Sequence, residues 1–531
     1  MQKFCSRQIN MSFLYLFSMT VVQSTEARRS LNATFNDTLN FKTMLRKLLT
    51  LVSVLLYFSC AFGQTNKIAA FENGLTETKE IIFADSVVPS FNILDRMKFY
   101  KVPSVSIAVI NNGKIEWAKA YGYADVEDKR LANPTTLYQA ASITKSVNAV
   151  GIMKLAESGR LSLTKDLRRY LKTWTFPDNE FSKGKTITIT NLLSHTAGLN
   201  VHGFIGYSTS DSLPTINEIL NGQRPANNEA VKPILPPGTQ FEYSGGGTTI
   251  IRKILDDNIS DNYDSLMKRL VLKPLKMENS SFSQPLEKKY KNYAFAYDGK
   301  MQVVKGTYYL YPEQIAGGLW TTATDIAKFI IAVQESLNGT KGAILNKEEA
   351  TEMLTPPLSN SQYALGFGID EKGGEKYFWH SGESYGFCSL YYGSFNTGKG
   401  VVILTNSFPP NGTPLLYEVL NSVAKVYQWK DFYKPVVKKL ISVPDTLLNK
   451  YAGEYYSENP RIKISIIRKE HDLILTARQS EKMFATGLDT FYVASSPNDN
   501  CIFSSSRSDG VFDTFKVIHE GKVIINATKT Q

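Results

Sequence analysis

The chain has 531 residues, 43% of them apolar, which is enough to bury a large core and more than one domain. Lysine plus arginine exceed aspartate plus glutamate by 60 to 49, but the first 63 residues hold seven basic and two acidic side chains and so carry five of the eleven net charges. The remainder is mildly basic and has no dense basic run, so composition argues against a nucleic-acid partner.

The first recognisable element is an apolar segment at residues 44–63. Arg46 and Lys47 precede an apolar run, and small residues end it at Ala61 to Gly63, which is the pattern of a secretory signal peptide. The run is shorter than the roughly 20 residues that a membrane-spanning helix needs. We therefore expect export to the periplasm or the medium with cleavage after Gly63, and no stable membrane span.

Two features of this leader leave alternatives. Cys60 could accept a lipid, although Tyr57 to Ser59 before it form a poor lipobox. A signal peptide normally begins a chain, so we interpret residues 1–43 as an over-long gene-model extension and Met44 as the initiator.

The predicted strands and helices that follow have the order of an α+β fold, and we assign them to one domain at residues 64–430. Residues 102–125 alternate as strands around an Asn112-Gly113 hairpin turn. A helical pattern with apolar Val147, Val150 and Leu155 on one face precedes a mostly helical region. Strands return at residues 366–406, followed by an apolar helix at about residues 414–428. This order predicts an antiparallel sheet built from both ends of the domain, with flanking helices and a mostly helical subdomain.

After a linker at residues 431–447 the pattern changes. Residues 448–531 contain short alternating runs such as "IKISIIRK" separated by turn residues, which predicts a small all-β unit, a barrel or curled sheet. Of the four cysteines, only Cys388 and Cys501 follow the leader, so one disulfide is possible. No metal-ligand spacing is present, and we expect neither a metal nor a cofactor.

Two serines compete as the nucleophile. Ser384 stands in Gly382-Glu383-Ser384-Tyr385-Gly386, which matches the G-x-S-x-G elbow of α/β-hydrolases. An elbow needs a helix after the serine, whereas "GFCSLYYGSF" and "VVILTN" follow as two strands. We therefore interpret this match as accidental.

Ser142 is the stronger candidate because Lys145 stands three residues later at the start of a helix. That spacing puts both side chains on one helix face, so the amine can reach the hydroxyl. The amino end of the helix also offers free N–H groups to a developing oxyanion. The pattern alone is common, and an isolated match usually marks a capping serine with a solvated lysine.

The surrounding landmarks carry a resemblance to a known superfamily. In order they are "VPSVSIAVI", "YQAASITKSV", "ITITNLLSHTAGL", "LPPGTQFEYSGGG", "IAGGLWTTATDIAKF", "ALGFGI" and "HSGESYGF". This series resembles the serine β-lactamase and penicillin-binding protein superfamily, in its branch of class C β-lactamases, DD-peptidases and esterases. The resemblance runs from about Phe91 to Gln428. It implies a β-lactamase-like fold and acyl-enzyme chemistry.

The resemblance also implies residue roles. Ser142 would be acylated, Lys145 would be its partner, and Tyr243 would be the general base, because Lys⁺ beside a tyrosine favours tyrosinate. The segment His380-Ser381-Gly382 would occupy the Lys-Thr-Gly strand of the family. The N–H groups of Glu383 and Ser142 would form the oxyanion hole.

Two departures from the family pattern weaken the case for β-lactamase activity. Gly245 stands where the family has an asparagine that holds the acyl amide of the substrate. His380 replaces a lysine, so we expect a titratable charge where the family has a fixed one. We therefore expect a serine hydrolase whose substrate is a D-amino-acid peptide or amide, or a small ester. A class C β-lactamase and a catalytically silent peptidoglycan-fragment-binding protein are the alternatives.

Three further features receive structural interpretations. His195 in "LLSHTAGL" reads as structural, since the site already has its acid and base. Asp325 reads as a helix cap or first-turn acid. The carboxy-terminal unit resembles the lipocalin-like accessory domains of such hydrolases and could shape the cleft or only add stability. The sequence leaves the oligomeric state open.

Overall fold

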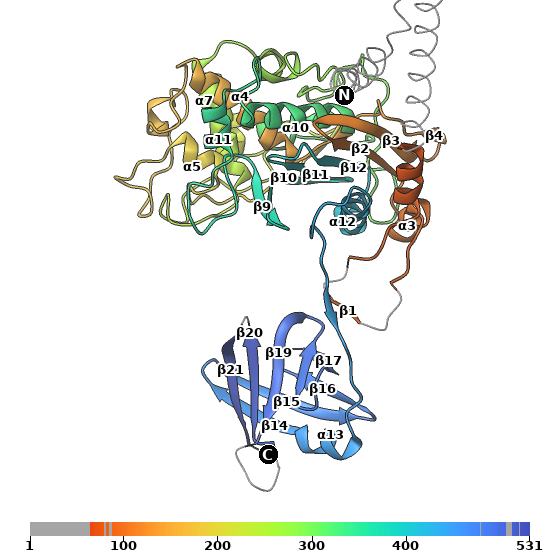
Figure 1. Cartoon of the computed structure of the whole chain (residues 1–531). Coiled ribbons are helices and arrows are strands. Elements are labelled where there is room, and N and C mark those ends of the chain that lie inside the picture. Colours follow the sequence, from red (N-terminus) through yellow and green to blue (C-terminus); the bar gives the residue numbers. More distant parts are fainter. Residues whose placement is uncertain are drawn as a thin grey trace, which may run out of the picture. The chain divides into compact units, whose positions relative to one another are not determined.

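The computed structural model describes residues 64–78, 81–83, 88–477, 479–505, 512–519 and 521–530. The expected signal peptide at residues 44–63 and the extension at residues 1–43 lie outside them. Within the described residues, no helix combines the length and apolar composition that crossing a membrane requires. Figure 1 shows the elements along the chain.

A seven-stranded sheet forms the centre of the larger α+β part (Figure 1), in the order β4-β3-β2-β12-β11-β10-β9. Strand β12 pairs antiparallel with β2, so segments from both ends of the domain meet in one sheet. This arrangement confirms the expected α+β fold. The strands are β2 (Ser104–Asn111), β3 (Lys114–Asp125), β4 (Arg130–Leu131), β9 (Gly368–Lys372), β10 (Glu375–Ser384), β11 (Phe387–Ser394) and β12 (Gly400–Thr405).

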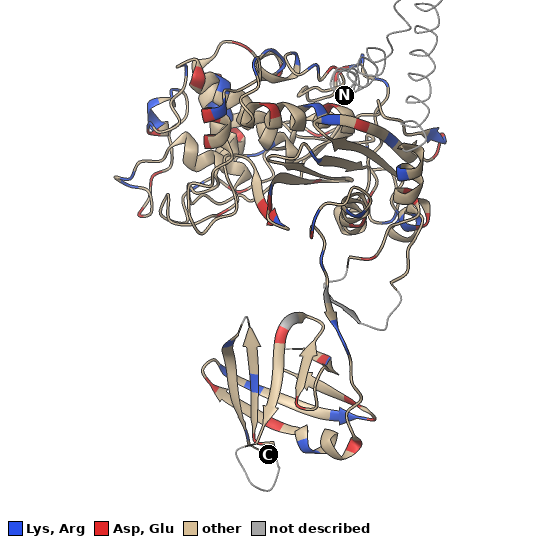
Figure 2. Cartoon of the chain, in the orientation of Figure 1, with Lys and Arg blue, Asp and Glu red and all other residues tan. Residues whose placement is uncertain are grey.

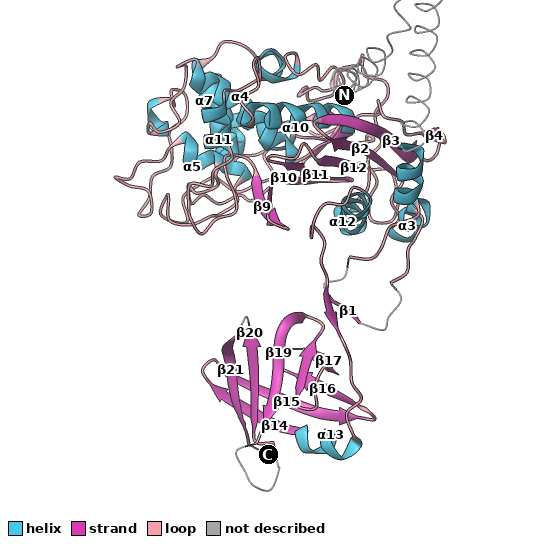
Figure 3. Ribbon diagram, viewed as in Figure 1, coloured by secondary structure: helices cyan, strands magenta, loops and turns pink. Residues whose placement is uncertain are grey.

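The hairpin between β2 and β3 turns at Asn112 and Gly113, which adopt φ of 52° and 67°. Two consecutive left-handed residues give the turn whose twist matches the flanking strands, which explains the Asn-Gly pair. Helices cover both faces of the sheet (Figure 3), and β11 and β12 are buried throughout. The covering helices are α3 (Ile93–Tyr100), α10 (Ala323–Leu337) and α12 (Pro409–Val426). Helix α12 begins several residues before the expected start, because Pro409 suits a first helical turn.

Helix α4 (Ile143–Glu157) is buried on most of its circumference, not only on the apolar face that the sequence predicts. Its polar residues are buried because they have partners. Ser146 Oγ donates to the Gly366 carbonyl at 2.7 Å, and Asn148 Nδ2 donates to the Ile315 carbonyl at 2.6 Å. The helix that carries Ser142 at its amino end is therefore fixed by the core around it.

The remaining elements of this part are mostly short helices, as expected for the middle of the chain. The helices are η1 (Leu167–Arg169), α5 (Ile189–Leu193), α6 (Ile216–Asn221), α7 (Gly245–Asn258), α8 (Tyr263–Met267), η2 (Lys268–Leu272), α9 (Gln314–Gly317) and α11 (Lys347–Met353). The short strand pairs are β5 (Tyr138–Gln139) with β8 (Trp320–Thr321), β6 (Tyr207–Ser208) with β7 (Tyr309–Leu310), and β1 (Ile81–Phe83) with β13 (Val436–Lys438).

The carboxy-terminal unit is a closed eight-stranded barrel, which confirms the predicted all-β unit. Aromatic side chains, including Tyr455, Phe503 and Phe515, fill its interior as a cluster separate from the main core. Its elements are α13 (Asp445–Tyr451), β14 (Gly453–Glu458), β15 (Arg461–Lys469), β16 (Asp472–Thr476), β17 (Ser480–Ala485), β18 (Thr490–Val493), β19 (Ser496–Ser504), β20 (Thr514–His519) and β21 (Lys522–Lys529).

Two sequence expectations about charge and cysteines can be compared with the structure. Cys388 on β11 and Cys501 on β19 are both free and buried, so the possible disulfide between them does not form. In the view of Figure 2, basic and acidic residues are interspersed over the described chain without a large region of one sign. That distribution agrees with the composition, which argues against a polyanion partner.

Candidate active site

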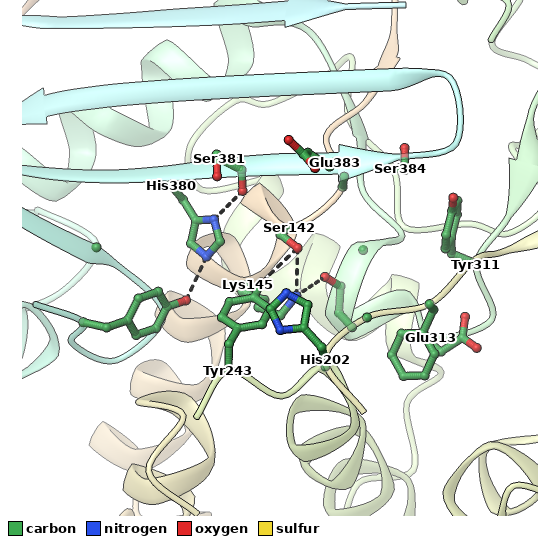
Figure 4. Close-up of a pocket in the computed structure, with 18 of the residues that line it drawn as sticks. Ser142, Lys145, His202, Tyr243, Tyr311, Glu313, His380, Ser381, Glu383 and Ser384 are labelled. Carbon is green, nitrogen blue, oxygen red and sulfur yellow. Dashed lines mark hydrogen bonds between the residues drawn. The ribbon is translucent and has the colours of Figure 1, made fainter. Parts of the chain in front are cut away.

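The predicted site residues come together around one cavity of about 480 Å³ (Figure 4). Helix α4, the segment before α7, α9 and strand β10 supply its walls. Six of the seven residues that the sequence singles out line it: Ser142, Lys145, Tyr243, His380, Ser381 and Glu383. The seventh, Gly382, lies on β10 between Ser381 and Glu383.

Ser142 occupies the residue before the first turn of α4, and its hydroxyl makes no capping hydrogen bond. Lys145 Nζ donates to Ser142 Oγ at 3.0 Å and to the Ala316 carbonyl at 2.8 Å. The lysine side chain is buried, so its amine is held in one place. Ala141, immediately before the serine, adopts a left-handed φ of 46°, and such strain is typical of residues that aim a functional group.

Tyr243 brings a second polar group to the same hydroxyl. Its O–H donates to Ser142 Oγ at 3.0 Å, and Lys145 Nζ lies 5.1 Å from the centre of its ring. The tyrosine is held because the next residue, Ser244, caps α7 by accepting the Gly247 N–H at 2.8 Å. Ser142 Oγ thus lies between an amine and a phenol, the pair needed to remove its proton.

Strand β10 presents an open edge to the cavity. It pairs with β9 only as far as Trp379, opposite Gly368, whereas its pairing with β11 continues to Ser384. Among the described residues, the second half of β10 therefore has a partner strand on one side only. An extended substrate could add to the free side through main-chain hydrogen bonds.

Gly382 lies so close to the serine that no side chain fits. A Cβ added there would stand 2.2 Å from the Ala140 carbonyl oxygen and 2.9 Å from the Ser142 nitrogen. Both are backbone atoms, which cannot move aside cheaply. The glycine of His380-Ser381-Gly382 is thus required for β10 to approach the start of α4.

His380 differs from the expectation of a titratable charge. Burial, with a contribution from the nearby Lys145 ammonium, lowers the pKa of its imidazole to about 3. The ring is 5% exposed, and both of its nitrogens contact protein groups, Tyr363 and the Ser381 carbonyl. The imidazole is therefore neutral at physiological pH, and the titratable charge that the sequence led us to expect there is not present, because the sequence does not reveal burial.

Ser384 is the last residue of β10, and a tight turn leads from it to β11. No helix follows it, so it does not stand on a nucleophile elbow, as the sequence predicts. Asp325 also agrees with its structural interpretation. It lies in the first turn of α10, fully buried, and its carboxylate accepts from Asn279 N at 2.8 Å.

His195 supports the site by contacting Tyr243 and Ser244. Its Nδ1 accepts the Ser244 N–H at 3.1 Å, and its ring centre lies 4.1 Å from that of Tyr243. Burial lowers the pKa of this imidazole well below its ordinary value, with a contribution from Lys145. A neutral, buried ring that packs on Tyr243 supports the structural interpretation, and it acts by fixing the tyrosine.

Sequence reasoning missed three residues that line the cavity. His202 lines the cavity and packs on Tyr243 with 4.8 Å between ring centres. Tyr363 binds His380, and Glu313 lines the cavity beside α9. None of the three belongs to a recognisable pattern, because each reaches the site only through tertiary folding.

Gly245, where the family pattern has asparagine, has little space for a side chain. A Cβ there would meet the His202 carbonyl oxygen and the Phe204 ring, each at 3.1 Å. Phe204 thus occupies part of the volume that an amide would use. The acyl-amide contact expected of the family is absent from this position.

Comparisons with known proteins agree with this geometry. "Protein flp" of Staphylococcus aureus (strain MRSA252) is 27% identical over 362 residues, covering 67% of each chain. "Putative penicillin-binding protein PbpX" of Bacillus subtilis (strain 168) is 28% identical over 323 residues, covering 60% of this chain and 73% of that protein. The solved octameric penicillin-binding protein homologue from Pyrococcus abyssi superposes with a TM-score of 0.56 at 25% identity, covering 82% of this chain and 98% of that one.

The family assignment rests on a family model that matches more than half of the chain. A family model described as Beta-lactamase matches residues 92–422, a range that holds Ser142, Lys145, Tyr243 and His380. The comparisons therefore agree with the fold. The chain belongs to the Beta-lactamase family, within the superfamily of serine β-lactamases and penicillin-binding proteins.

Proposed function

We propose that the protein is a serine hydrolase that works through an acyl-enzyme on Ser142. The observation that carries this proposal is the pair of hydrogen bonds, each 3.0 Å long, from Lys145 Nζ and the Tyr243 hydroxyl to Ser142 Oγ. A pure binding protein needs neither group at that oxygen. A serine hydroxyl is a weak nucleophile, and this arrangement supplies both a base and a cation to activate it.

The reaction begins when Tyr243, which lies beside Lys145, acts as the general base and takes the Ser142 proton. Oγ attacks the substrate carbonyl carbon, and the N–H groups of Ser142 and Glu383 receive the negative charge on the carbonyl oxygen. Tyr243 then returns the proton to the leaving group. In the second half-reaction a water molecule attacks the acyl carbon, gives its proton to Tyr243 and releases the acid, and Ser142 regains its proton.

The cavity walls support a class of substrate. Aromatic side chains line much of the cavity, among them Phe204, Tyr311 and Trp379, which suits a small acyl group. The open edge of β10 suits an extended peptide, so D-amino-acid peptides, amides and small esters are the proposed substrates. A β-lactam is disfavoured because neutral His380 lacks the charge that attracts its carboxylate, and Gly245 lacks the amide for its acyl group.

A substrate panel tests this proposal. D-alanyl peptides, D-amino-acid amides, short p-nitrophenyl esters and a chromogenic cephalosporin would be compared by kcat/KM, with Ser142→Ala as the control. We expect turnover of esters or D-aminoacyl substrates, little of the cephalosporin, and loss of at least about a thousandfold in the variant. Binding of peptidoglycan fragments without turnover of any substrate would favour the silent binding protein instead.

We also propose export, which the basic residues and apolar run at residues 44–63 support. Expressed in a Gram-negative host, the mature protein should be found outside the cytoplasm. Its first residue should be Gln64 by amino-terminal sequencing. Retention in the cytoplasm with an uncut leader would contradict export, and a lipid on Cys60 would contradict cleavage after Gly63.

A further inference from the structure

A glutamate that the proposed mechanism does not use stands in the wall of the active-site cavity. Glu313 lines the same cavity as Ser142, and its side chain is fully buried. Neither carboxyl oxygen has a hydrogen-bond partner among the described residues. In Figure 4, Glu313 and Tyr311 lie at the side of the cavity away from His380. A buried polar group without a partner is costly, so its presence needs an explanation.

The fold ties this glutamate to the catalytic serine. Glu313 directly precedes α9, and its carbonyl accepts the Ala316 N–H at 2.8 Å. The Ala316 carbonyl in turn accepts Lys145 Nζ at 2.8 Å. One helical turn, a rise of about 5 Å, therefore separates Glu313 from the residue that holds the lysine.

Among the residues that the structure describes, no cation is bound to Glu313. On α7, Arg252 pairs with Asp256 at 2.8 Å and donates to the Gln314 side chain, one residue along. On α4, Lys145 is directed to Ser142 and Ala316. These groups leave the carboxyl of Glu313 itself unpaired within the described chain.

Two phenols, those of Tyr207 and Tyr311, lie in the environment of Glu313, and this environment is buried and of low polarity. Burial raises the pKa of Tyr207 to about 12 and the pKa of Tyr311 above its usual range, so both phenols are neutral. The same desolvation raises the pKa of Glu313 to about 8. The empty site thus holds a neutral carboxylic acid at neutral pH.

The position of Glu313 indicates which part of a substrate would reach it. The leaving group must lie near the Tyr243 hydroxyl, which returns the proton, and the Tyr243 ring is 6.5 Å from that of His380. Just beyond the last residue of β10, the Tyr311 hydroxyl accepts the Tyr385 N–H at 3.0 Å. Because Glu313 and Tyr311 lie on the side of the cavity away from His380 (Figure 4), Glu313 would face the acyl portion of the substrate.

We propose that Glu313 anchors a subsite for an amino group carried on the acyl portion of the substrate. The inference rests on the proposed hydrolase and names the class of acyl group that it prefers. An ammonium supplies the hydrogen bonds that the two carboxyl oxygens lack, and the apolar walls strengthen the ion pair. Binding then converts the carboxylic acid to a carboxylate and releases one proton to solvent.

A matched pair of esters tests the subsite. p-Nitrophenyl 6-aminohexanoate and p-nitrophenyl heptanoate share the leaving group and the chain length and differ in the ammonium. We expect wild type to prefer the amino ester by about tenfold in kcat/KM near pH 8. The ratio should fall by close to tenfold for each pH unit below about 8, because the released proton then opposes binding. Any pH dependence of the acylation chemistry at Ser142 affects both esters and cancels in the ratio.

Two variants test whether Glu313 causes the preference for the amino ester. Glu313→Gln, nearly isosteric, should bring the ratio to about one at every pH. Glu349→Gln is the matched control, because burial also raises the pKa of Glu349 but it lies on α11 outside the cavity lining. That control should keep the wild-type ratio. If Glu313→Gln does not fold, Glu313→Met takes its place.

The subsite and the proposed hydrolase can be tested separately. Isothermal titration of n-hexylammonium in two buffers measures proton release without any hydrolysis; near pH 7 wild type should release close to one proton and Glu313→Gln none. Turnover of both esters with a ratio near one would overturn the subsite and leave the hydrolase. The subsite at Glu313 would also be overturned if Glu383→Gln lost the preference for the amino ester while Glu313→Gln kept it. Absence of all turnover would overturn the hydrolase, and the titration would still decide the subsite.

Discussion

The hydroxyl of Tyr363 donates a hydrogen bond of 2.8 Å to Nε2 of His380. Nδ1 of the same ring lies 2.5 Å from the Ser381 carbonyl oxygen, which can only accept, so Nδ1 carries the proton. These contacts specify one neutral tautomer. The imidazole has neither a charge nor a free N–H for a substrate anion, which separates this site from one with a lysine at that position.

The first prediction concerns this tautomer. Because the pKa of His380 is lowered to about 3, its Cε1–H resonance should not shift between about pH 8 and 5.5. The measurement is a ¹H–¹³C NMR titration, with His380→Gln to identify the signal. A titration midpoint near 6.5 would mean that the ring faces solvent and that Tyr363 does not hold it.

The second prediction links the same histidine to acid stability. The unfolded chain binds a proton at His380 below about pH 6.5, whereas the folded chain does not until about pH 3. The unfolded state therefore gains protons first, and the free energy of unfolding falls as pH falls through this window. In urea unfolding below about pH 6, His380→Gln should lose about 1 kcal/mol less per pH unit than wild type. An equal loss in both proteins would contradict the lowered pKa.

The third prediction concerns the approach of β10 to α4. In Gly382→Ala the new methyl group would collide with the Ala140 carbonyl and the Ser142 N–H. We expect β10 to be displaced and kcat/KM to fall by at least about a hundredfold, because the proposed oxyanion site needs N–H groups from both of these segments. Gly299→Ala is the control, since its nearest atom would be 3.6 Å away. Comparable activity in both variants would show that this approach is not needed.

The fourth prediction concerns the barrel. Its aromatic interior is a cluster separate from the main core, and the cavity residues all precede it. A chain that ends at Pro444 should therefore fold and react with a fluorophosphonate at Ser142. Circular dichroism and labelling would measure both properties. An insoluble or unreactive truncated protein would mean that the barrel supports the hydrolase fold.

Much of this fold could be predicted because its signals are local. The alternation in residues 102–125 and the Asn112-Gly113 turn identify a hairpin without any knowledge of the rest of the chain. The three-residue spacing of Ser142 and Lys145 similarly fixes their mutual position once a helix forms. The G-x-S-x-G match at Ser384 could be rejected for the same reason, since the strand after it is visible in the sequence.

The properties that depend on burial could not be predicted. The sequence shows that His380 replaces a lysine, but its neutral state results from desolvation and from Tyr363, 17 residues away in the chain. Glu313 belongs to no motif, and only the packed structure shows that its carboxyl is buried beside the cavity. Side-chain environment at such positions is a tertiary property, which local periodicity does not encode.

The most direct test of the central claim is to identify the serine that a fluorophosphonate labels. Wild-type protein would be treated with the probe, digested and analysed by mass spectrometry, alongside Ser142→Ala and Ser384→Ala. We expect one adduct, on the peptide that contains Ser142, because Lys145 and Tyr243 activate that hydroxyl. The adduct should persist in Ser384→Ala and disappear in Ser142→Ala. An adduct on Ser384, or labelling that persists in Ser142→Ala, would contradict the account.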